Sequence, residues 1–284
     1  MSAWRIEKVA DEGSSSPYYA RLWAGIPELR DAVLNARVDS RQLEAARYQF
    51  DEQYEPVLRS LDSARKTTRN VRDILKGHRQ KLEDGGIVRF QRNAFEISES
   101  ISDLLRDHFA QFLNNVVRAL KGSQEVVKYF GVEIGCLFTK DQNFVQGIAQ
   151  LKQNGQSRLA DFLSETRSRW SANLIQRRHD LEHKGWTLPN TDYRVTSDGK
   201  VEMHEPQVDG QVVSAYTHEM FNRVTSFVEN VIVYSFQVAV KPDLGIAEIP
   251  KDLRPNSCPK RFALWHPIMG TPEWNLSYSE DDFL

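Results

Sequence analysis

The sequence predicts a mainly α-helical fold, an up-and-down four-helix bundle. Two observations predict it: long stretches in which apolar residues recur three and four apart, and short connections between most of these stretches. The four bundle helices are expected near residues 56–83, 92–121, 157–184 and 215–240. A third observation, alternating apolar residues around turn-forming dipeptides, predicts a small β-hairpin insert at 192–213, before the last long helix.

The first two bundle helices follow from their apolar stripes and the glycines that end them. After Pro56, apolar or small residues fall alternately four and three apart in a heptad-like pattern, which stops at Gly85-Gly86. The stretch 92–121 has a broad apolar face, and Gly122 follows it. Both helices are therefore expected to bury one side.

The last two bundle helices have similar signals. Ser157 is a good N-cap, a stripe of apolar residues reaches Leu181, and Gly185 is the expected stop of the third helix. The fourth helix shows a wide apolar stripe between Met220 and Phe236.

Two segments flank the expected bundle domain, residues 56–240. An N-terminal helical extension is expected over 1–55, where Pro27 favours a helix start. The segment 241–284 holds six of the eleven prolines, so an irregular tail packed on the bundle is expected there.

Composition excludes several classes of protein. The formal charge of −2 gives no general attraction to nucleic acid or anionic membranes. Cys136 and Cys258 are far apart and lack zinc-site spacing, so neither a disulfide framework nor structural zinc is indicated. The first residues lack the apolar stretch of a signal peptide, and polar residues interrupt the most apolar late segment, 224–240. A cytoplasmic protein without a membrane span is expected.

The residues most informative about function are Arg178-His179-Asp180-Leu181-Glu182-His183, directly before the expected helix stop. A residue turns about 100° in a helix, so His179 and His183 share a face while Arg178 and His183 lie about 140° apart. Because the chain departs at Gly185, His183 is expected to leave the helical register and meet Arg178 across a groove. The helix C-terminus also favours a protonated imidazole.

This cluster resembles the motif of the HEPN superfamily of helical-bundle proteins, an Arg followed by four to six residues and a His, often with a polar residue after the Arg. Arg178, His179 and His183 fit that pattern, at the end of the third bundle helix. In that family Asn or Asp often follows the Arg, whereas His179 stands at that position here. The resemblance covers at most residues 56–240.

The resemblance implies a metal-independent endoribonuclease that needs no cofactor, often a toxin or a defence component, working as a homodimer whose two motifs face one cleft. It implies that His183 is the acid–base residue in attack of the ribose 2′-hydroxyl on the phosphate. Arg178 would hold that phosphate and His179 would support it. RNA is the implied partner, with an antitoxin or a nucleotidyltransferase as a further partner protein. A guanidinium and an imidazole suit this chemistry physically.

The spacing alone is a weak signal in a chain with many arginines. Arg72–His78 and Arg261–His266 also match it, and Arg177 gives a second match to His183. The position at a helix end favours the cluster over those pairs. The simplest alternative is a solvated helix end in which Arg178 and Glu182 form an exposed ion pair.

Two other functions fit the same sequence. His179-Asp180-Leu181-Glu182-His183 also spells His-x-x-Glu-His, a zinc hydrolase pattern that needs a third protein ligand. A non-catalytic helical scaffold or regulatory partner is the other alternative, supported by the heptad-like helix after Pro56.

Overall fold

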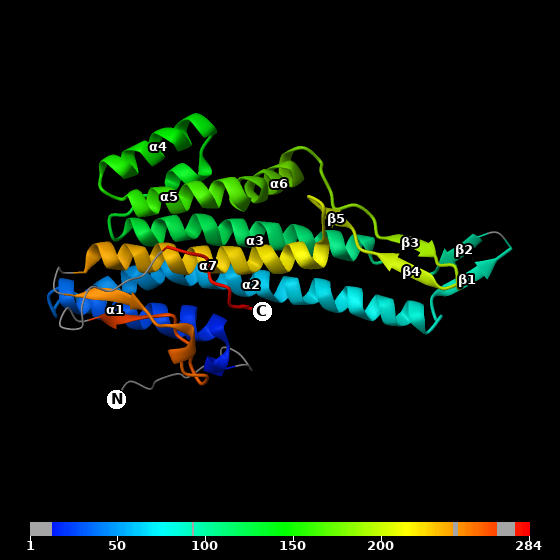
Figure 1. The fold of residues 1–284 in the computed structure, drawn as a ribbon, viewed down its shortest axis with the longest axis horizontal. Coiled ribbons are helices and arrows are strands. Elements are labelled where there is room, and N and C mark those ends of the chain that lie inside the picture. Colours follow the sequence, from blue (N-terminus) through cyan, green and yellow to red (C-terminus); the bar gives the residue numbers. More distant parts are fainter. Residues whose placement is uncertain (1–12, 93, 241–243, 266–275) are drawn as a thin grey trace. The chain divides into compact units, whose positions relative to one another are not determined.

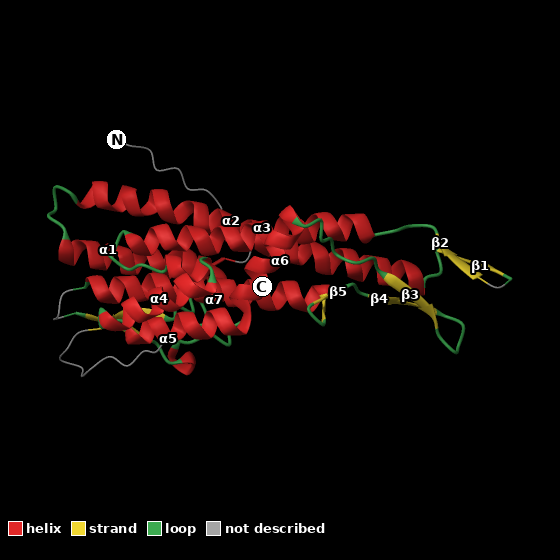
Figure 2. Ribbon diagram, turned by 90° about the horizontal axis from the view of Figure 1, so that it is seen from above, coloured by secondary structure: helices red, strands yellow, loops and turns green. Residues whose placement is uncertain are grey.

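The structure is a computed structural model that describes residues 13–92, 94–240, 244–265 and 276–284 (Figure 1). It is mainly helical, with small antiparallel strand pairs, as predicted (Figure 2). The chain forms two compact units, each assembled from segments that are distant in the sequence. The first unit comprises residues 1–58, 122–163 and 225–283, and the second comprises 59–121, 164–224 and Leu284.

The first unit contains one whole strand pair and several helices or parts of helices. Short single-turn or π-helical segments lie at Gly13–Ser15, Tyr19–Gly25, Gly135–Phe138 and Lys251–Leu253. Its regular elements are α1 (Ile26–Arg37), the first part of α2 (Leu43–Glu83), the end of α3 (Ser102–Lys128), α4 (Asp141–Gln153), most of α5 (Ser157–Thr166), the second half of α7 (Val213–Ala239), β7 (Gly245–Glu248) and β8 (Phe262–Trp265).

Aromatic side chains fill the core of the first unit. The rings of Phe50 and Phe130 lie 6.0 Å apart, and those of Phe130 and Phe236 lie 5.0 Å apart at nearly right angles. All three side chains are buried, so α2, the segment after α3 and α7 meet at this cluster.

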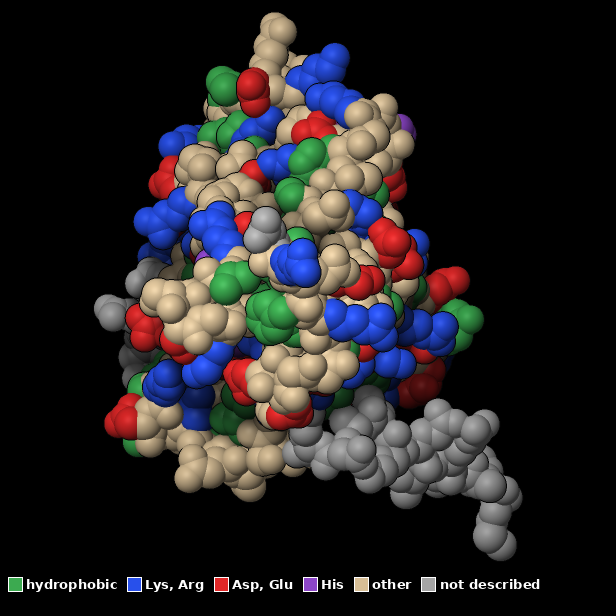
Figure 3. Space-filling view, turned by 90° about the vertical axis from the view of Figure 1, so that its right-hand side faces the viewer, with side chains coloured by type: hydrophobic (Ala, Val, Ile, Leu, Met, Phe, Trp, Pro, Cys, Tyr) green, Lys and Arg blue, Asp and Glu red, His purple; other side chains and the backbone are tan. Residues whose placement is uncertain are grey.

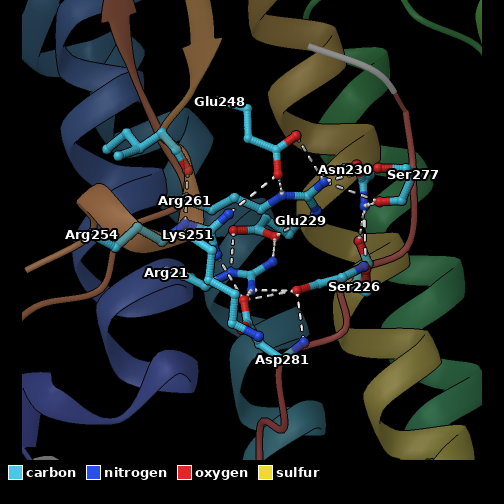
Figure 4. A network of polar contacts seen from close by, with 12 residues as sticks. Arg21, Ser226, Glu229, Asn230, Glu248, Lys251, Arg254, Arg261, Ser277 and Asp281 are labelled. Carbon is cyan, nitrogen blue, oxygen red and sulfur yellow. Dashed lines mark hydrogen bonds and ion pairs between the residues drawn. The ribbon is translucent and has the colours of Figure 1, made fainter. Parts of the chain in front are cut away.

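A network of buried ion pairs lies in the same unit (Figure 4). Arg21 donates to both carboxylate oxygens of Glu229, and its other terminal nitrogen lies 2.8 Å from Asp281. Arg254 also contacts Asp281, at 2.8 Å, and Arg261 donates to Glu248 at 2.7 Å. Arg21 and Glu229 are each only 1% exposed, so each charge is stabilised by its ion-pair partners instead of by water.

The second unit contains the other helical parts and three hairpins. Its helical parts are α2 from Arg59, α3 up to Lys121, the π-helical segment Arg167–Ser171, α6 (Ala172–His183) and the first half of α7. Its strand pairs are β1 (Val88–Gln91) with β2 (Ala94–Ile97), β3 (Asp192–Val195) with β4 (Val201–His204), and β5 (Gln207–Val208) with β6 (Gln211–Val212).

Phe109 of α3 lies at the centre of the second unit. Its ring is 5.8 Å from that of Tyr216 in α7 and 5.9 Å from that of Trp186, just after α6. These contacts bring α3, the end of α6 and the start of α7 together. The hairpin insert predicted before the last helix is confirmed, with Asp192 opposite His204 and Val195 opposite Val201.

Two predicted helix boundaries are wrong. The helix expected from Pro56 begins at Leu43 and continues through the proline, because Tyr54 and Val57 on either side are both buried and their packing outweighs the lost hydrogen bond.

The helix expected from residue 92 begins at Ser102. Residues 88–91 and 94–97 form β1 and β2 instead, where Phe90 pairs with Phe95, because alternating apolar and polar residues suit a strand.

The tail is less irregular than expected. β7 pairs with β8, with Gly245 opposite Trp265, so the prediction of a wholly irregular segment after residue 241 is wrong. Residues 241–243 and 266–275 of that segment lie outside the described residues.

The helices of the described residues include none that is both long and apolar enough to cross a membrane. Lysine and arginine side chains lie among aspartate and glutamate on the face drawn in Figure 3, in keeping with the small net charge of the chain.

Candidate functional site

The cluster at residues 178–183 occupies the last turns of α6. The helix ends at His183, Lys184 is its C-cap, and Gly185 adopts a φ of 68°. The backbone N–H of Trp186 then returns to the carbonyl oxygen of Asp180, at 3.2 Å. The predicted stop at Gly185 is confirmed, because a glycine adopts this left-handed conformation without steric cost.

His183 stays in the helix, so the expectation that it leaves the helical register is wrong. The N–H of Lys184 donates to the carbonyl oxygen of Asp180 at 2.9 Å, which keeps the last turn closed beyond His183. The chain changes direction only at Gly185, two residues later. Arg178 and His183 are therefore not brought into direct contact by a break in the helix.

Glu182 connects the two residues instead. One of its carboxylate oxygens forms an ion pair with Arg178, and the other lies 3.6 Å from Nε2 of His183. The Arg178–Glu182 pair spans one helical turn, which is the contact expected of a solvated helix end. It also gives the guanidinium and the imidazole a common neighbour.

Arg178 has a second neighbour on α3. Its Nε donates to Oδ1 of Asn114 over a long 3.4 Å contact. The side chain of Arg178 is 30% exposed, that of Glu182 25% and that of His183 58%. The histidine is thus open to solvent, while the arginine is partly held against its own unit.

His179 lies beside His183, as their four-residue spacing predicts. The two ring centroids are 4.8 Å apart and the ring planes are inclined by 54°. Two imidazoles and one guanidinium therefore gather around the end of α6.

The neighbouring charged residues have other partners. Asp180 accepts from Lys184 and from Gln176, and these contacts, that of Lys184 first, hold the pKa of its carboxyl below the ordinary value. Arg177 forms an ion pair with Asp209 and places its guanidinium 4.5 Å from the ring centre of Trp186. Arg177 thus points to the hairpin insert rather than to His183.

The other Arg–His matches have structural roles. His78 is 2% exposed and its Nε2 lies 2.8 Å from the hydroxyl of Tyr193. Burial lowers the pKa of His78 and favours the neutral ring. Arg261 belongs to the buried network of the first unit, and His266 lies outside the described residues.

The zinc interpretation finds no third ligand among the residues that the structure describes. Over the residues that the structure describes, no three His, Cys, Asp or Glu side chains lie close enough together to hold a metal ion. A catalytic zinc needs three protein ligands, so His179 and His183 do not make such a site with a described third residue.

The second unit also contains a cavity that sequence patterns did not predict. It has a volume of about 220 Å³ and lies between the π-helical segment before α6, the β5–β6 turn and the start of α7. Trp170, Asp209 and Tyr216 are among its lining residues. The Asp209-Gly210 turn was the available signal, but a turn dipeptide indicates a hairpin and says nothing of a cavity beside it.

The chain matches no protein-family model, no curated protein and no solved structure.

Proposed function

We propose that the protein is a metal-independent endoribonuclease of the HEPN type, with its site at the end of α6. One observation supports this most: Glu182 contacts both Arg178 and His183, so a cation that binds phosphate and a group that transfers protons share one exposed helix end. The helical parts of the second unit, from α2, α3, α6 and α7, would form the HEPN-like four-helix bundle.

In this mechanism His183 accepts the proton of the ribose 2′-hydroxyl. The 2′-oxygen forms a bond to phosphorus, the bond from phosphorus to the 5′-oxygen breaks, and the leaving oxygen takes a proton from solvent. The products are a 2′,3′-cyclic phosphate and a free 5′-hydroxyl. Arg178 stabilises the charge that develops on the phosphate oxygens, and His179 supports the neighbouring imidazole.

Arg178 retains donors for this task. A guanidinium has five N–H groups, and the Asn114 and Glu182 contacts use only part of them. A phosphate can therefore approach while Glu182 keeps the guanidinium in place.

The assembly and the biological setting belong to the same proposal. A homodimer would place two copies of the cluster in one cleft, with RNA as the substrate. A toxin or defence role follows by analogy, with an antitoxin or a nucleotidyltransferase as the partner protein.

The test is cleavage of a mixed RNA pool in the presence of EDTA. The wild-type protein is compared with His183→Ala, Arg178→Ala and, as a control on the same surface, Lys184→Ala. We expect cleavage by the wild type and the control, and a loss of at least about 100-fold in the other two, the lower bound for removal of an acid–base group or of a donor that stabilises developing charge. Equal cleavage by all four proteins would contradict the assignment.

A non-catalytic helical scaffold is the second candidate. The Arg178–Glu182 ion pair favours it, because a solvated helix end forms this contact without any catalytic role. A wild-type protein that binds RNA or a partner protein but never cleaves RNA would support the scaffold.

A further inference from the structure

The cavity of the second unit has features of a ligand site. Its volume of about 220 Å³ lies below the roughly 300–1,000 Å³ of pockets for drug-sized molecules, so its occupant is small. Two aromatic residues, Trp170 and Tyr216, contribute to the wall. A flat, partly polar molecule of about one ring system suits such a space.

The charges around the cavity balance. Arg169 pairs with Glu165 at 2.8 Å, and Arg223 pairs with Glu219, which also accepts from Gln211 at 2.7 Å. The arginines that line the cavity are thus neutralised by carboxylates. A free phosphate or a metal ion would gain little electrostatic binding energy here, because no net charge of the opposite sign faces it. A neutral polar ring needs hydrogen-bond donors and acceptors instead.

Those groups are present as two amides. Asn173 and Gln211 both line the cavity. The amide nitrogen of Gln211 is engaged by Glu219, which leaves its oxygen as an acceptor. Amide side chains are the ones that pair with two adjacent polar atoms of adenine.

Tyr216 provides a further polar group. Its side chain is almost wholly buried, yet its hydroxyl has no hydrogen-bond partner in the described part of the chain. A buried polar atom without a partner is unfavourable, and a ligand that supplies a partner would relieve that cost. Burial raises the pKa of Tyr216 well above the ordinary value, so the phenol remains a donor.

The cavity is also connected to the cluster at the end of α6. The Asp209-Gly210 turn places Asp209, with a φ of 51°, at the cavity wall, where its carboxylate pairs with Arg177. Arg177 directly precedes Arg178 in the helix.

We propose that this cavity binds a single nucleobase, with adenine preferred, of the RNA that the end of α6 cleaves. The inference rests on the proposed function, since it assigns the cavity to recognition of that same substrate. Asn173 and Gln211 read the polar edge of the base, Tyr216 supplies a hydroxyl and Trp170 forms part of the apolar wall.

The test is binding of AMP to the full chain, measured by calorimetry, with CMP and ribose 5-phosphate as comparison ligands. We expect AMP to bind, CMP to bind more weakly, and ribose 5-phosphate, which lacks a base, to give no heat. Asn173→Leu is expected to weaken AMP binding about tenfold, the effect of one lost polar contact pair. Gln150→Leu, an exposed glutamine on α4, is the matched control.

Tyr216→Phe separates binding from folding. It removes only the hydroxyl, which has no hydrogen-bond partner among the described residues, so AMP binding should weaken without a fall in melting temperature. His183→Ala separates this inference from the proposed function: it should bind AMP like the wild type while cleaving no RNA. Absence of AMP binding by the wild type, or equal binding of ribose 5-phosphate, would overturn the nucleobase site whatever the cleavage assay shows.

Discussion

The guanidinium of Arg178 is ion-paired with the carboxylate of Glu182, one helical turn further along α6. The same carboxylate lies 3.6 Å from His183. A single acidic side chain thus adjoins both residues to which the proposed ribonuclease mechanism assigns roles. Replacing Glu182 tests whether it positions these residues or only forms an ion pair at a helix end.

Glu182→Gln is therefore expected to lower RNA cleavage about tenfold without abolishing it, because the amide keeps the shape but attracts the guanidinium and the imidazole less strongly. Stability should change by less than about 1 kcal/mol, as for other partly exposed ion pairs. Metal-free RNA cleavage and urea unfolding measure the two effects. Unchanged cleavage would show that Glu182 has no positioning role.

The buried His78 predicts a pH-dependent stability. Burial, the largest effect, lowers its pKa, so the native state keeps the ring neutral while the unfolded chain takes up a proton near the ordinary value of 6.5. Below that value the unfolded state binds more protons, so the free energy of unfolding should fall as the pH drops from 7 to 5.

This contribution should be absent in His78→Leu, whose pH dependence should be flatter than that of the wild type over the same range. His204→Leu, which removes an exposed histidine in β4, should retain the wild-type slope. Identical slopes in all three proteins would contradict the assignment to His78.

The buried ion pair of the first unit predicts a large loss of stability when it is broken. Arg21→Met leaves the carboxylate of Glu229 buried without its main partner, which typically costs about 3–5 kcal/mol. Arg47→Met removes a more exposed arginine, paired with Asp31 at 3.0 Å, and should cost much less stability than Arg21→Met.

Urea unfolding of the two variants compares these losses directly. The double variant Arg21→Met, Glu229→Met should be more stable than Arg21→Met alone, because the carboxylate of Glu229 is no longer left buried without its main partner. Equal stability of Arg21→Met and Arg47→Met would show that the network does not hold the first unit together.

Replacing Gly185, at the end of α6, should lower the stability of the protein. Its φ of 68° disfavours any side chain, so Gly185→Ala should lower the free energy of unfolding by about 1–2 kcal/mol. Gly77→Ala is the matched control, because Gly77 lies inside α2, where an added Cβ meets nothing within 4 Å beyond the local helix backbone and its chain neighbours. It should stabilise the protein by about 0.5–1 kcal/mol. The same sign in both variants would contradict the left-handed turn.

Local signals predicted the helical class, the hairpin insert and the stop at Gly185, since each depends on residues close together in the chain. The predicted helix includes part of the stretch 88–97, because the apolar residues of so short a stretch fit the period of a helix as well as that of a strand. A helix start was expected at Pro56, and burial of its neighbours overrides that local preference.

Such local signals do not predict contacts between residues that are distant in the sequence. In the sequence, Glu229 is only a polar residue that interrupts an apolar stripe. In the structure it is the buried partner of Arg21, 208 positions away. At the candidate site, spacing placed His179 beside His183 correctly. The bridging position of Glu182 depends on side-chain orientation and on His183 staying helical, which spacing does not determine.

The most direct test of the central claim is the chemistry of the RNA ends produced in EDTA. If His183 deprotonates the 2′-hydroxyl, the wild-type protein should leave 2′,3′-cyclic phosphates and 5′-hydroxyls, detected by end-group mass spectrometry, and His183→Ala should leave none. Products that the wild type and His183→Ala form equally, or a wild-type protein that leaves the RNA intact, would contradict the account.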